Sequence, residues 1–580
     1  MSTVDVADHR TLAPQERSAR ALGLGTMLCT LVLAIVAFLV VYPVLLLLIH
    51  SFEVGPFGRP TYWGVENWIR AFTQPDLVGA LWNTVSLAVT RQFISILVAI
   101  PICWIIARTD LPGRNWLEFG FWVCVFLPQL TVTLGWIMVF DSHNGLANQL
   151  LERLPFVEKG PFDIFTWWGI VLTHLLSGSI AIKVMLLTPA FRNLDASLEE
   201  ASLASGASTV ATLFRVVVPL LAPALLVVTI LSTIRALEAF ETELILGAPA
   251  QIDVFSTKIY RIATREPPEY GVATALSMVI LGIVMPLILF QQWFISRRSH
   301  ATLSGKYRGH LQPLGAWRWP LFAVIFGIVF VMTILPVALV ITGTFMNLFG
   351  YFQIANPWTM KHWTAVLGNA TFMNALVNTL IIAGGTAILG MLAFTVIAYI
   401  IVRTKYFARS TLDFFVWLPS TLPGIILGLG FLWFFLGTPM LRPLYGTTWI
   451  LILVAALGTI TLGTQLVKST LVQLGAELEE ASWASGASWQ YTLKRVVLPL
   501  IAPAIAVIGV VAFSAAARTT GTIALLATHT NQPLSMLQLN LMADNNYGAA
   551  SVVGVFLLVL TIGVALIARG FGLRLGVGGR

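Results

Sequence analysis

Long stretches without a charged side chain are the feature of this sequence that most constrains its fold. Residues 21–49 contain no Asp, Glu, Lys or Arg, and about 20 apolar residues suffice for one helix to cross a bilayer. Only 10% of the 580 residues are charged, whereas soluble domains carry roughly 25%. The composition therefore excludes a soluble enzyme, a fibrous protein and a disordered chain. Because an open strand cannot satisfy its backbone polar groups in lipid, we expect an all-α polytopic membrane protein.

About twelve candidate spans follow from this length criterion, in two groups of six. The first group is expected near residues 22–50, 80–107, 116–140, 165–190, 216–247 and 271–296. The second group is expected near residues 319–348, 374–402, 410–437, 447–470, 496–528 and 548–568. Residues 1–21 are predicted to form a cytoplasmic N-terminal tail. Residues 297–318 are predicted to form a cytoplasmic linker between a first half, 22–296, and a second half, 319–580.

The distribution of basic residues predicts the orientation. Of the 34 Lys and Arg residues, 21 lie in the N-terminal tail, the alternate loops and the C-terminal end, and nine lie in the intervening loops. Basic loops favour the cytoplasm, so both termini are predicted to be cytoplasmic. The net charge of +8 is then a topology signal, and no nucleic-acid partner is expected. The three cysteines and eight histidines show no metal-ligand spacing, so no metal site is predicted.

The chain contains an internal duplication. Residues 199–225, EEASLASGASTVATLFRVVVPLLAPAL, match residues 479–505, EEASWASGASWQYTLKRVVLPLIAPAI, at 19 of 27 positions with an offset of 280. Further matches, at an offset of 295, are Asn83-Thr84 with Asn378-Thr379, Arg108-Thr109 with Arg403-Thr404, and Leu127-Pro128 with Leu422-Pro423. A unit of six spans ends on the side where it began. The halves are therefore expected to be two parallel six-helix repeats, related by a pseudo-two-fold axis along the membrane normal.

The matched segment lies between the fourth and fifth spans of each half, on the predicted cytoplasmic side. Its pattern predicts a short helix, then a turn at a glycine that accommodates positive φ, then a second segment that enters a membrane helix. Small side chains around the turn let another protein approach closely, and the acidic pairs can meet its basic residues. A solvated loop is the alternative, but such loops tolerate length changes, whereas this spacing is identical in both copies. The residues expected to form the interface are Glu199, Glu200, Ala201 and Gly206 in the first copy, and Glu479, Glu480, Ala481 and Gly486 in the second.

This doubled pattern resembles the EAA motif of inner-membrane permeases of binding-protein-dependent ABC importers. The fused two-repeat layout, with stretches such as 246–249 (LGAP) and 267–271 (PPEYG), is similar to the ferric-iron and thiamine-type permeases. Ser202 and Ser482 replace the second alanine of the motif, a small-for-small change. The resemblance implies the type I ABC importer permease fold, with transmembrane repeats at about 78–292 and 374–568.

The same resemblance implies the partners. Two copies of a separate ATPase subunit would dock on the two EAA elements. A periplasmic or lipid-anchored binding protein would deliver a small solute, with ferric iron as the first choice. No cofactor is expected in this chain, because ATP is bound by the partner subunit and the sequence has no G-x-x-x-x-G-K-[ST] motif. The chain is thus predicted to be a non-enzymatic, multi-pass subunit in the bacterial inner membrane and in contact with its lipid.

Two alternatives stay open at this stage. Thiamine, a polyamine, a phosphonate or another small anion is an alternative solute, because selectivity in such systems lies largely in the binding protein. A twelve-span secondary transporter is an alternative of a different class. It would need a coupling-ion site and no ATPase-docking element, so the doubled motif argues against it.

Ionisable residues at membrane depth are candidates for lining the translocation path. The candidates are Glu238, Glu241, Arg518 and Arg91. Glu238 and Arg518 are equivalent at the offset of 280, and one interpretation pairs them near the outer end of the path. The alternative is a local pair of Glu238 with Arg235, three residues earlier. For Arg91, a packing partner such as Glu is an equal alternative, and Lys183 is expected to extend toward the cytoplasmic surface.

Overall fold

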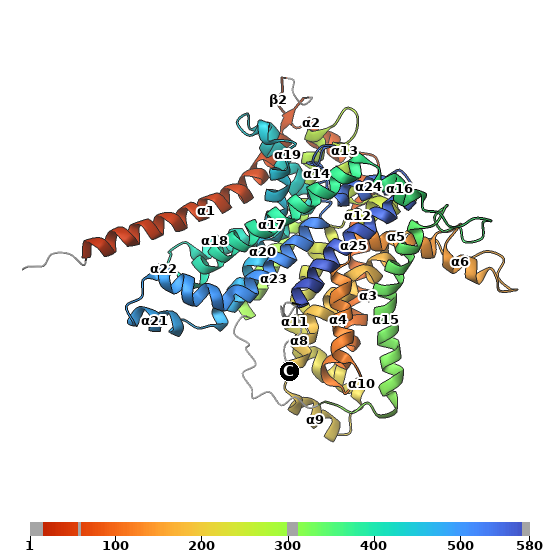
Figure 1. The fold of residues 1–580 in the computed structure, drawn as a ribbon, viewed down its shortest axis with the longest axis horizontal. Coiled ribbons are helices and arrows are strands. Elements are labelled where there is room, and N and C mark those ends of the chain that lie inside the picture. Colours follow the sequence, from red (N-terminus) through yellow and green to blue (C-terminus); the bar gives the residue numbers. More distant parts are fainter. Residues whose placement is uncertain (1–14, 56–59, 299–310, 571–580) are drawn as a thin grey trace, which may run out of the picture.

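The computed structural model describes residues 15–55, 60–298 and 311–570. Within these residues, ten helices are long and apolar enough to cross a membrane, and two further pairs of bent helices raise the number to twelve. The only paired strands there are β1 (Glu53–Val54) and β2 (Tyr62–Trp63), which form an antiparallel hairpin. The predicted all-α polytopic architecture is confirmed (Figure 1).

The first half begins with the longest helix of the molecule, α1 (Gln15–Ser51), which starts inside the stretch expected to be a tail. The helices that follow it are α2 (Glu66–Phe72), α3 (Leu77–Arg108), α4 (Arg114–Phe126), α5 (Gln129–Phe140), α6 (Leu146–Leu151), α7 (Trp167–His174), the π-helical η1 (Leu175–Ser179), α8 (Ile180–Arg192), α9 (Ala196–Ala204), α10 (Thr209–Thr212), the π-helical η2 (Leu213–Val217), α11 (Val218–Leu237), α12 (Glu241–Gly247), α13 (Phe255–Ala263) and α14 (Tyr270–Arg298).

The second half follows a similar order, but it has no helix at the position of α12. Its helices are the short η3 (Gly315–Trp317), α15 (Arg318–Thr344), α16 (Lys361–Leu367), α17 (Ala370–Arg403), α18 (Arg409–Trp417), η4 (Leu418–Thr421), α19 (Gly424–Gly437), η5 (Arg442–Leu444), α20 (Thr448–Gln473), α21 (Glu477–Ala484), α22 (Trp489–Thr492), the π-helical η6 (Leu493–Val497), α23 (Leu498–Ala517), α24 (Leu534–Ala543) and α25 (Tyr547–Gly570). Of the expected linker, residues 299–310 lie outside the described residues, as do residues 1–14 of the expected tail.

The third and ninth spans are not the continuous helices that the apolar runs predicted. α4 and α5 meet at an angle of 101°, and the segment 409–421 meets α19 at 110°. Each break falls on a Leu-Pro pair of the duplication. Leu127 and Leu422 both have extended backbones, because a residue that precedes proline is disfavoured in the helical region.

The fifth and eleventh spans also end earlier than expected. α11 stops at Leu237 and α23 at Ala517, exactly one repeat apart. The chain then folds back, and the two returns are fixed by equivalent hydrogen bonds. The Phe255 amide donates to the Thr84 hydroxyl at 2.9 Å, and the Leu534 amide donates to the Thr379 hydroxyl at 2.8 Å. Glu241 and its neighbours therefore lie in a separate short helix, α12, and not in the fifth span.

The two halves exchange their first helices. α1 packs against α18 and α19 of the second half, whereas α15 packs against α4 and α5 of the first. Each crossing places a glycine of a broken span against a proline-containing helix. A Cβ added to Gly135 would lie 2.7 Å from the Pro336 carbonyl oxygen, and one added to Gly430 would lie 3.2 Å from the Pro43 Cβ. A side chain at Gly135 would clash with the Pro336 backbone, whereas one at Gly430 would make a tight contact, and the buried core is continuous across both halves.

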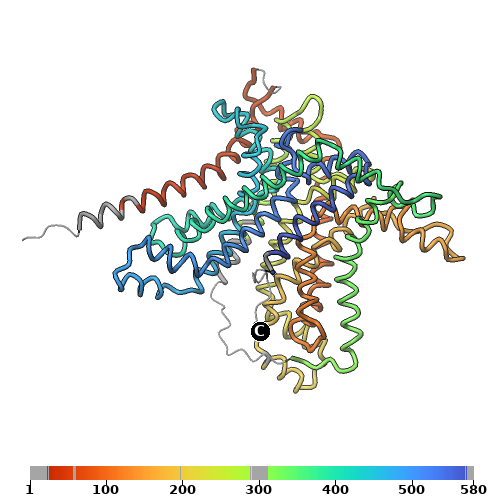
Figure 2. The backbone as a smooth tube through the Cα atoms, viewed as in Figure 1, coloured from red at the N-terminus to blue at the C-terminus, as the bar shows by residue number. Residues whose placement is uncertain are grey.

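The two helical bundles diverge, as the tube of Figure 2 shows. α9 lies at the lower end of the first-half bundle, and α21 lies at the left end of the second-half bundle. The two copies of the matched segment are thus at separate corners of the molecule, each at the end of its own bundle.

Candidate functional site

Both copies of the duplicated segment form a short helix, a glycine turn and a second helix. α9 ends before Gly206, where φ is +87°, and α21 ends before Gly486, where φ is +82°. After the turn, the Ser208 and Ser488 hydroxyls cap α10 and α22 by accepting hydrogen bonds from backbone amides. The second helix then runs through a π-helical turn into α11 or α23, each of which has proline in its first turn. We call α9 and α21, with their glycine turns, the docking elements.

A hydroxyl pair closes each docking element. Ser202 contacts the Thr212 hydroxyl at 2.9 Å, and Ser482 contacts the Thr492 hydroxyl at 2.8 Å. These serines stand where the EAA pattern has alanine. The replacement therefore adds a hydrogen bond between the two arms of the turn and keeps the small side-chain volume.

The first glutamate of each acidic pair is buried and binds an arginine at the end of a membrane helix. Glu199 Oε1 accepts from Arg108 Nε at 3.0 Å, and both side chains are 2% exposed. Arg403 Nε lies 2.7 Å from Glu479 Oε1, with the side chains 11% and 6% exposed. These are the arginines of the duplicated Arg-Thr pairs. The sequence comparison found them but gave them no role.

Each buried carboxylate has a further partner, and these partners differ between the copies. The Gln312 amide, from the expected linker, donates to Glu199 Oε2 at 3.0 Å. In the second copy the Tyr399 hydroxyl donates to Glu479 Oε2 at 3.3 Å. The pKa of the Glu199 carboxyl is raised by its burial, and the charge and hydrogen bonds of Arg108, together with the Gln312 hydrogen bond, oppose that rise. Sequence reasoning missed both Gln312 and Tyr399, because neither is matched by the same residue type in the other half.

The second glutamate of each pair, Glu200 or Glu480, is exposed, as are Ala201 and Ala481. The two glutamates of each acidic pair therefore have different positions and different contacts. One carboxylate fixes the docking element to a membrane helix, and the other lies on the free surface. We expected both carboxylates of each pair to meet basic residues of a partner protein. In the structure, only Glu200 and Glu480 lie on the surface and can do so.

The proposed pair of Glu238 with Arg518 is absent from the contacts of the described residues. The Glu238 carboxylate lies 3.5 Å from Arg235, the local alternative. Arg518 instead donates to the backbone carbonyls of Val125 and of Leu127, the latter at 3.3 Å. These carbonyls lie in the other half, at the break between α4 and α5, and no sequence signal connects them to Arg518.

Glu241, the first residue of α12, follows Phe240, whose ring comes within 3.4 Å of a Cβ built on Gly521 of the second half. In α12, the next residue, Thr242, packs onto α5, because its hydroxyl accepts a hydrogen bond from the Gln129 amide at 3.2 Å. The candidates Glu241 and Arg518 thus both lie where the two halves meet.

Arg91 pairs with a carboxylate. This packing partner was the alternative to a role in lining the translocation path. Its guanidinium lies 3.5 Å from Glu243 Oε1, which also contacts His174 Nε2 at 2.8 Å. Lys183 does not extend to the surface, since it is 1% exposed and donates to the Ser179 carbonyl at 3.3 Å. At the repeat offsets Arg91 corresponds to Thr386 and Glu243 to Ile523, so this charged cluster exists in the first half only.

The comparison with protein families decides between the classes considered above. The model of the binding-protein-dependent transport system inner membrane component matches residues 77–300 and again residues 389–577. The chain belongs to this family. The permease therefore carries the family unit twice, once in each half, and is the membrane subunit of an ABC importer.

Known proteins similar to the permease carry related names. It is 27% identical to the ferric transport system permease protein FbpB of Actinobacillus pleuropneumoniae, over 92% of this chain and 76% of that protein. It is also 27% identical to a putative ferric transport system permease protein of Haemophilus influenzae, over 87% of this chain and 78% of that protein. A solved bacterial ABC transporter involved in the import of alginate aligns with a TM-score of 0.37 and 20% identity, over 45% of this chain and 96% of that one.

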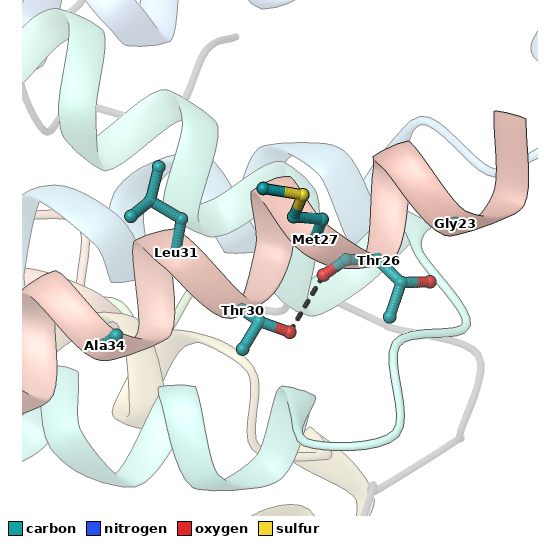
Figure 3. A pocket seen from close by; sticks show the side chains of 6 residues that line it. All are labelled: Gly23, Thr26, Met27, Thr30, Leu31 and Ala34. Atoms are coloured by element: carbon teal, nitrogen blue, oxygen red, sulfur yellow. Dashed lines mark hydrogen bonds between the residues drawn. The ribbon is translucent and has the colours of Figure 1, made fainter. Parts of the chain in front are cut away.

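A shallow groove of about 800 Å³ runs along one face of α1 in the permease. Figure 3 shows its six lining residues, Gly23, Thr26, Met27, Thr30, Leu31 and Ala34, all of them from α1. The Thr30 hydroxyl donates to the Thr26 carbonyl at 2.9 Å, so the helix backbone already uses this hydroxyl. The lining is otherwise apolar, which suits lipid tails and does not suit a charged solute.

Proposed function

We propose that this permease imports a small solute with the energy of ATP hydrolysed by two copies of a separate ATPase subunit, one docked on α9 and one on α21. The observation that carries this proposal is the duplicated docking element. In each copy an exposed glutamate, Glu200 or Glu480, lies beside a buried glutamate that is bound to an arginine of a membrane helix. A force applied at the exposed surface therefore passes through the ion pair into α3 or α17.

The surface opposite to the docking elements would receive a solute-binding protein. The docking elements and both termini would lie in the cytoplasm. The support is the excess of basic residues in the N-terminal tail, the alternate loops and the C-terminal end taken together, 21 against nine in the intervening loops. The opposite surface carries the β1–β2 hairpin, α2, α13 and α24 (Figure 1). The family name of the permease, a binding-protein-dependent component, supports this partner.

Ferric iron is the first choice of solute. The support is the similarity over most of the chain to the two permeases named for ferric transport. Thiamine, a polyamine, a phosphonate or another small anion are the alternatives, and they would use the same machinery. Identification of the solute that the partner binding protein retains on purification would decide among them.

The docking elements can be tested by charge reversal with a matched control. The double variant Glu200→Lys with Glu480→Lys should insert into the membrane but lose solute uptake, because its exposed carboxylates no longer meet basic residues of the ATPase. The control is Ser197→Lys with Glu477→Lys, an equivalent and exposed pair on the same two helices. Co-purification of the ATPase should fall for the first double variant only. Normal uptake and normal ATPase recovery in that variant would refute the assignment.

A further inference from the structure

The fourth membrane span is built differently in the two halves. In the first half it is interrupted at η1, where Gly178 has a φ of +152° and a ψ of −21°. In the second half it is α20, one continuous helix of 26 residues. The offset of 280 applies to this span, because it carries Arg192, the end of α8, to position 472, and α20 ends at Gln473. Gly178 is therefore equivalent to Gly458, which lies inside the continuous helix.

The break in the first half is loosely packed. Glycine adopts positive φ at little steric cost, unlike other residues. Gly178 is buried, yet no atom of a neighbouring element in the described chain lies within 4 Å of a Cβ built on it. The hydroxyl of Ser177, also buried, has no hydrogen-bond partner among the described residues. The backbone at η1 thus has space in which it can change its conformation.

The second half is tightly packed at the equivalent place. Lys183, which donates to the carbonyl of Ser179 at the end of η1, corresponds to Gly463 at the offset of 280. A Cβ built on Gly463 would lie 2.2 Å from Cδ2 of Phe394 in α17. The backbone of α20 therefore lies directly against a side chain of α17, and this contact leaves no room for a bend toward α17.

A second weak point of the first half lies in α3. This helix contains Pro101, and a proline inside a helix removes one backbone hydrogen bond and favours a kink. The offset of 295 aligns the ends of α3 and α17, Arg108 and Arg403. It places Val396 at the position of Pro101, and α17 contains no proline. Two adjacent helices of the first half are thus weakened where their counterparts in the second half are uninterrupted.

The two weak points lie at nearly the same depth. α3 and α8 run in the same direction, because the Cys103 thiol contacts the Val184 carbonyl at 3.8 Å and, further along, Arg108 donates to the Leu194 carbonyl at 2.9 Å. Cys103 is two residues beyond the proline, and Val184 is six residues beyond the glycine of the break. At 1.5 Å per residue, the weak points are about 6 Å apart along the bundle, roughly one helical turn.

Contacts hold one unit together on each side of this level. On the side of the docking element, Arg192 of α8 binds Glu118 of α4 at 2.7 Å, and the ion pair described above anchors α9 to the end of α3. On the other side, His174 of α7 contacts Glu243 of α12 at 2.8 Å, and α12 is bound to α5. The break separates these two units.

We propose that the first half bends at Gly178 and Pro101 during the transport cycle, whereas the second half moves as a rigid body. The unit formed by α8, α9 and the adjoining ends of α3 and α4 then tilts, while α7 and α12 keep their contacts with α5. This inference rests on the proposed function. It adds that two docking elements of similar form produce unequal motions in the membrane.

The bend can be measured in the transporter assembled with its ATPase and binding protein. Amide hydrogen exchange of peptides that cover residues 175–183 and 95–103 should differ at least about fivefold between the nucleotide-free transporter and the transporter trapped with ATP and vanadate. The equivalent peptides, 455–463 and 390–398, are internal controls and should differ less than about twofold. Equal changes in both halves, or no change in either, would overturn the proposal. If the unmodified chain does not retain the ATPase on purification, the proposed function itself fails, and the bend fails with it.

Matched variants give a second test. Gly178→Ala should lower uptake about tenfold, because an L-residue resists positive φ by a comparable factor, whereas Gly458→Ala should leave uptake unchanged. Pro101→Ala restores a helix hydrogen bond, so it should raise the thermal midpoint of the purified permease and still reduce uptake. Val396→Ala should leave uptake unchanged. A variant that is more stable but less active separates a hinge from a merely structural role, and it does not depend on the folding of Gly178→Ala. Normal uptake in either Gly178→Ala or Pro101→Ala would overturn the proposal.

Discussion

The buried Arg–Glu pairs predict that each docking element can be released separately. In Arg108→Gln, Glu199 would keep a carboxylate at a site that is 2% exposed, with Gln312 as its remaining side-chain donor. Removing one partner of a buried ion pair costs about 3–5 kcal/mol, and so little exposure leaves no solvent screening to reduce that cost. About 1.4 kcal/mol corresponds to a factor of ten. The equilibrium constant for anchoring α9 to the end of α3 should therefore fall by at least about 100-fold.

The release of α9 can be measured, because α9 has only nine residues. A helix of this length is not stable in water without tertiary contacts, so an unanchored α9 should unfold locally while the membrane helices persist. Amide hydrogen exchange would measure it. Peptides that cover residues 196–204 should exchange at least about 100-fold faster in Arg108→Gln, and peptides that cover residues 477–484 should not change.

The second copy supplies the reciprocal experiment. Arg403→Gln should accelerate exchange in α21 and spare α9, with an effect near the lower end of the range, because this pair is 11% and 6% exposed. The matched control is Arg114, a half-buried residue that begins α4 and donates to the Thr109 carbonyl at 3.4 Å, and Arg114→Gln should change neither helix. Equal acceleration in both docking elements, or in neither, would refute the view that each ion pair anchors its own element.

Three further outcomes are expected. Gly206→Val and Gly486→Val should each cost about 1–2 kcal/mol, because φ is positive at both sites and nothing lies within 4 Å of an added Cβ. Protease sensitivity of the two turns should rise equally in the isolated permease, whereas uptake should fall more for Gly486→Val, whose copy exposes the larger aromatic side chains. Gln312→Leu should accelerate exchange in α9 less than Arg108→Gln does, since one hydrogen bond to a charged group contributes about 1.5–3 kcal/mol, and exchange in α21 should stay constant. Glu243→Gln should lower the thermal midpoint of the purified permease by leaving Arg91 without a carboxylate, a loss of about 3 kcal/mol. An unchanged midpoint would mean that backbone contacts alone hold Arg91.

The features that repeat in the sequence were the predictable ones. The spans and the helix–glycine–helix form of the docking elements follow from hydropathy and from the match of residues 199–225 with 479–505. The breaks in the third and ninth spans were missed although the signal was present. Leu127-Pro128 and Leu422-Pro423 stand inside apolar runs, and composition alone treats such a run as one helix. A residue before proline resists the helical conformation, so the duplicated pair was evidence for a bend.

Contacts between residues far apart in the chain were not predictable from one sequence. Arg518 binds carbonyl oxygens more than 390 positions away. Every residue has a backbone carbonyl, so the identity of the residue does not reveal such a contact. Offset arithmetic pointed to Glu238 because it compares equivalent positions. Equivalent positions meet only on the axis itself, and Glu238 pairs with its local neighbour Arg235 instead. The prediction that Lys183 extends toward the cytoplasmic surface was wrong for a related reason. Its distance from the end of the span carries no information about the helices that pack around it.

The two halves share the form of the docking elements and differ in the polar contacts of their interior. The helices of the docking elements end two residues before their glycines and have the same hydroxyl pair and the same arginine anchor. Under the proposed function, two copies of one ATPase would require this similarity, because each would present an identical surface. The interior has no such requirement. The cluster around Arg91 and the contact of Arg518 with the carbonyls at the end of α4 each occur once among the described residues. A duplicated chain can thus hold polar contacts that are present in one half only, whereas two identical subunits would repeat each of them.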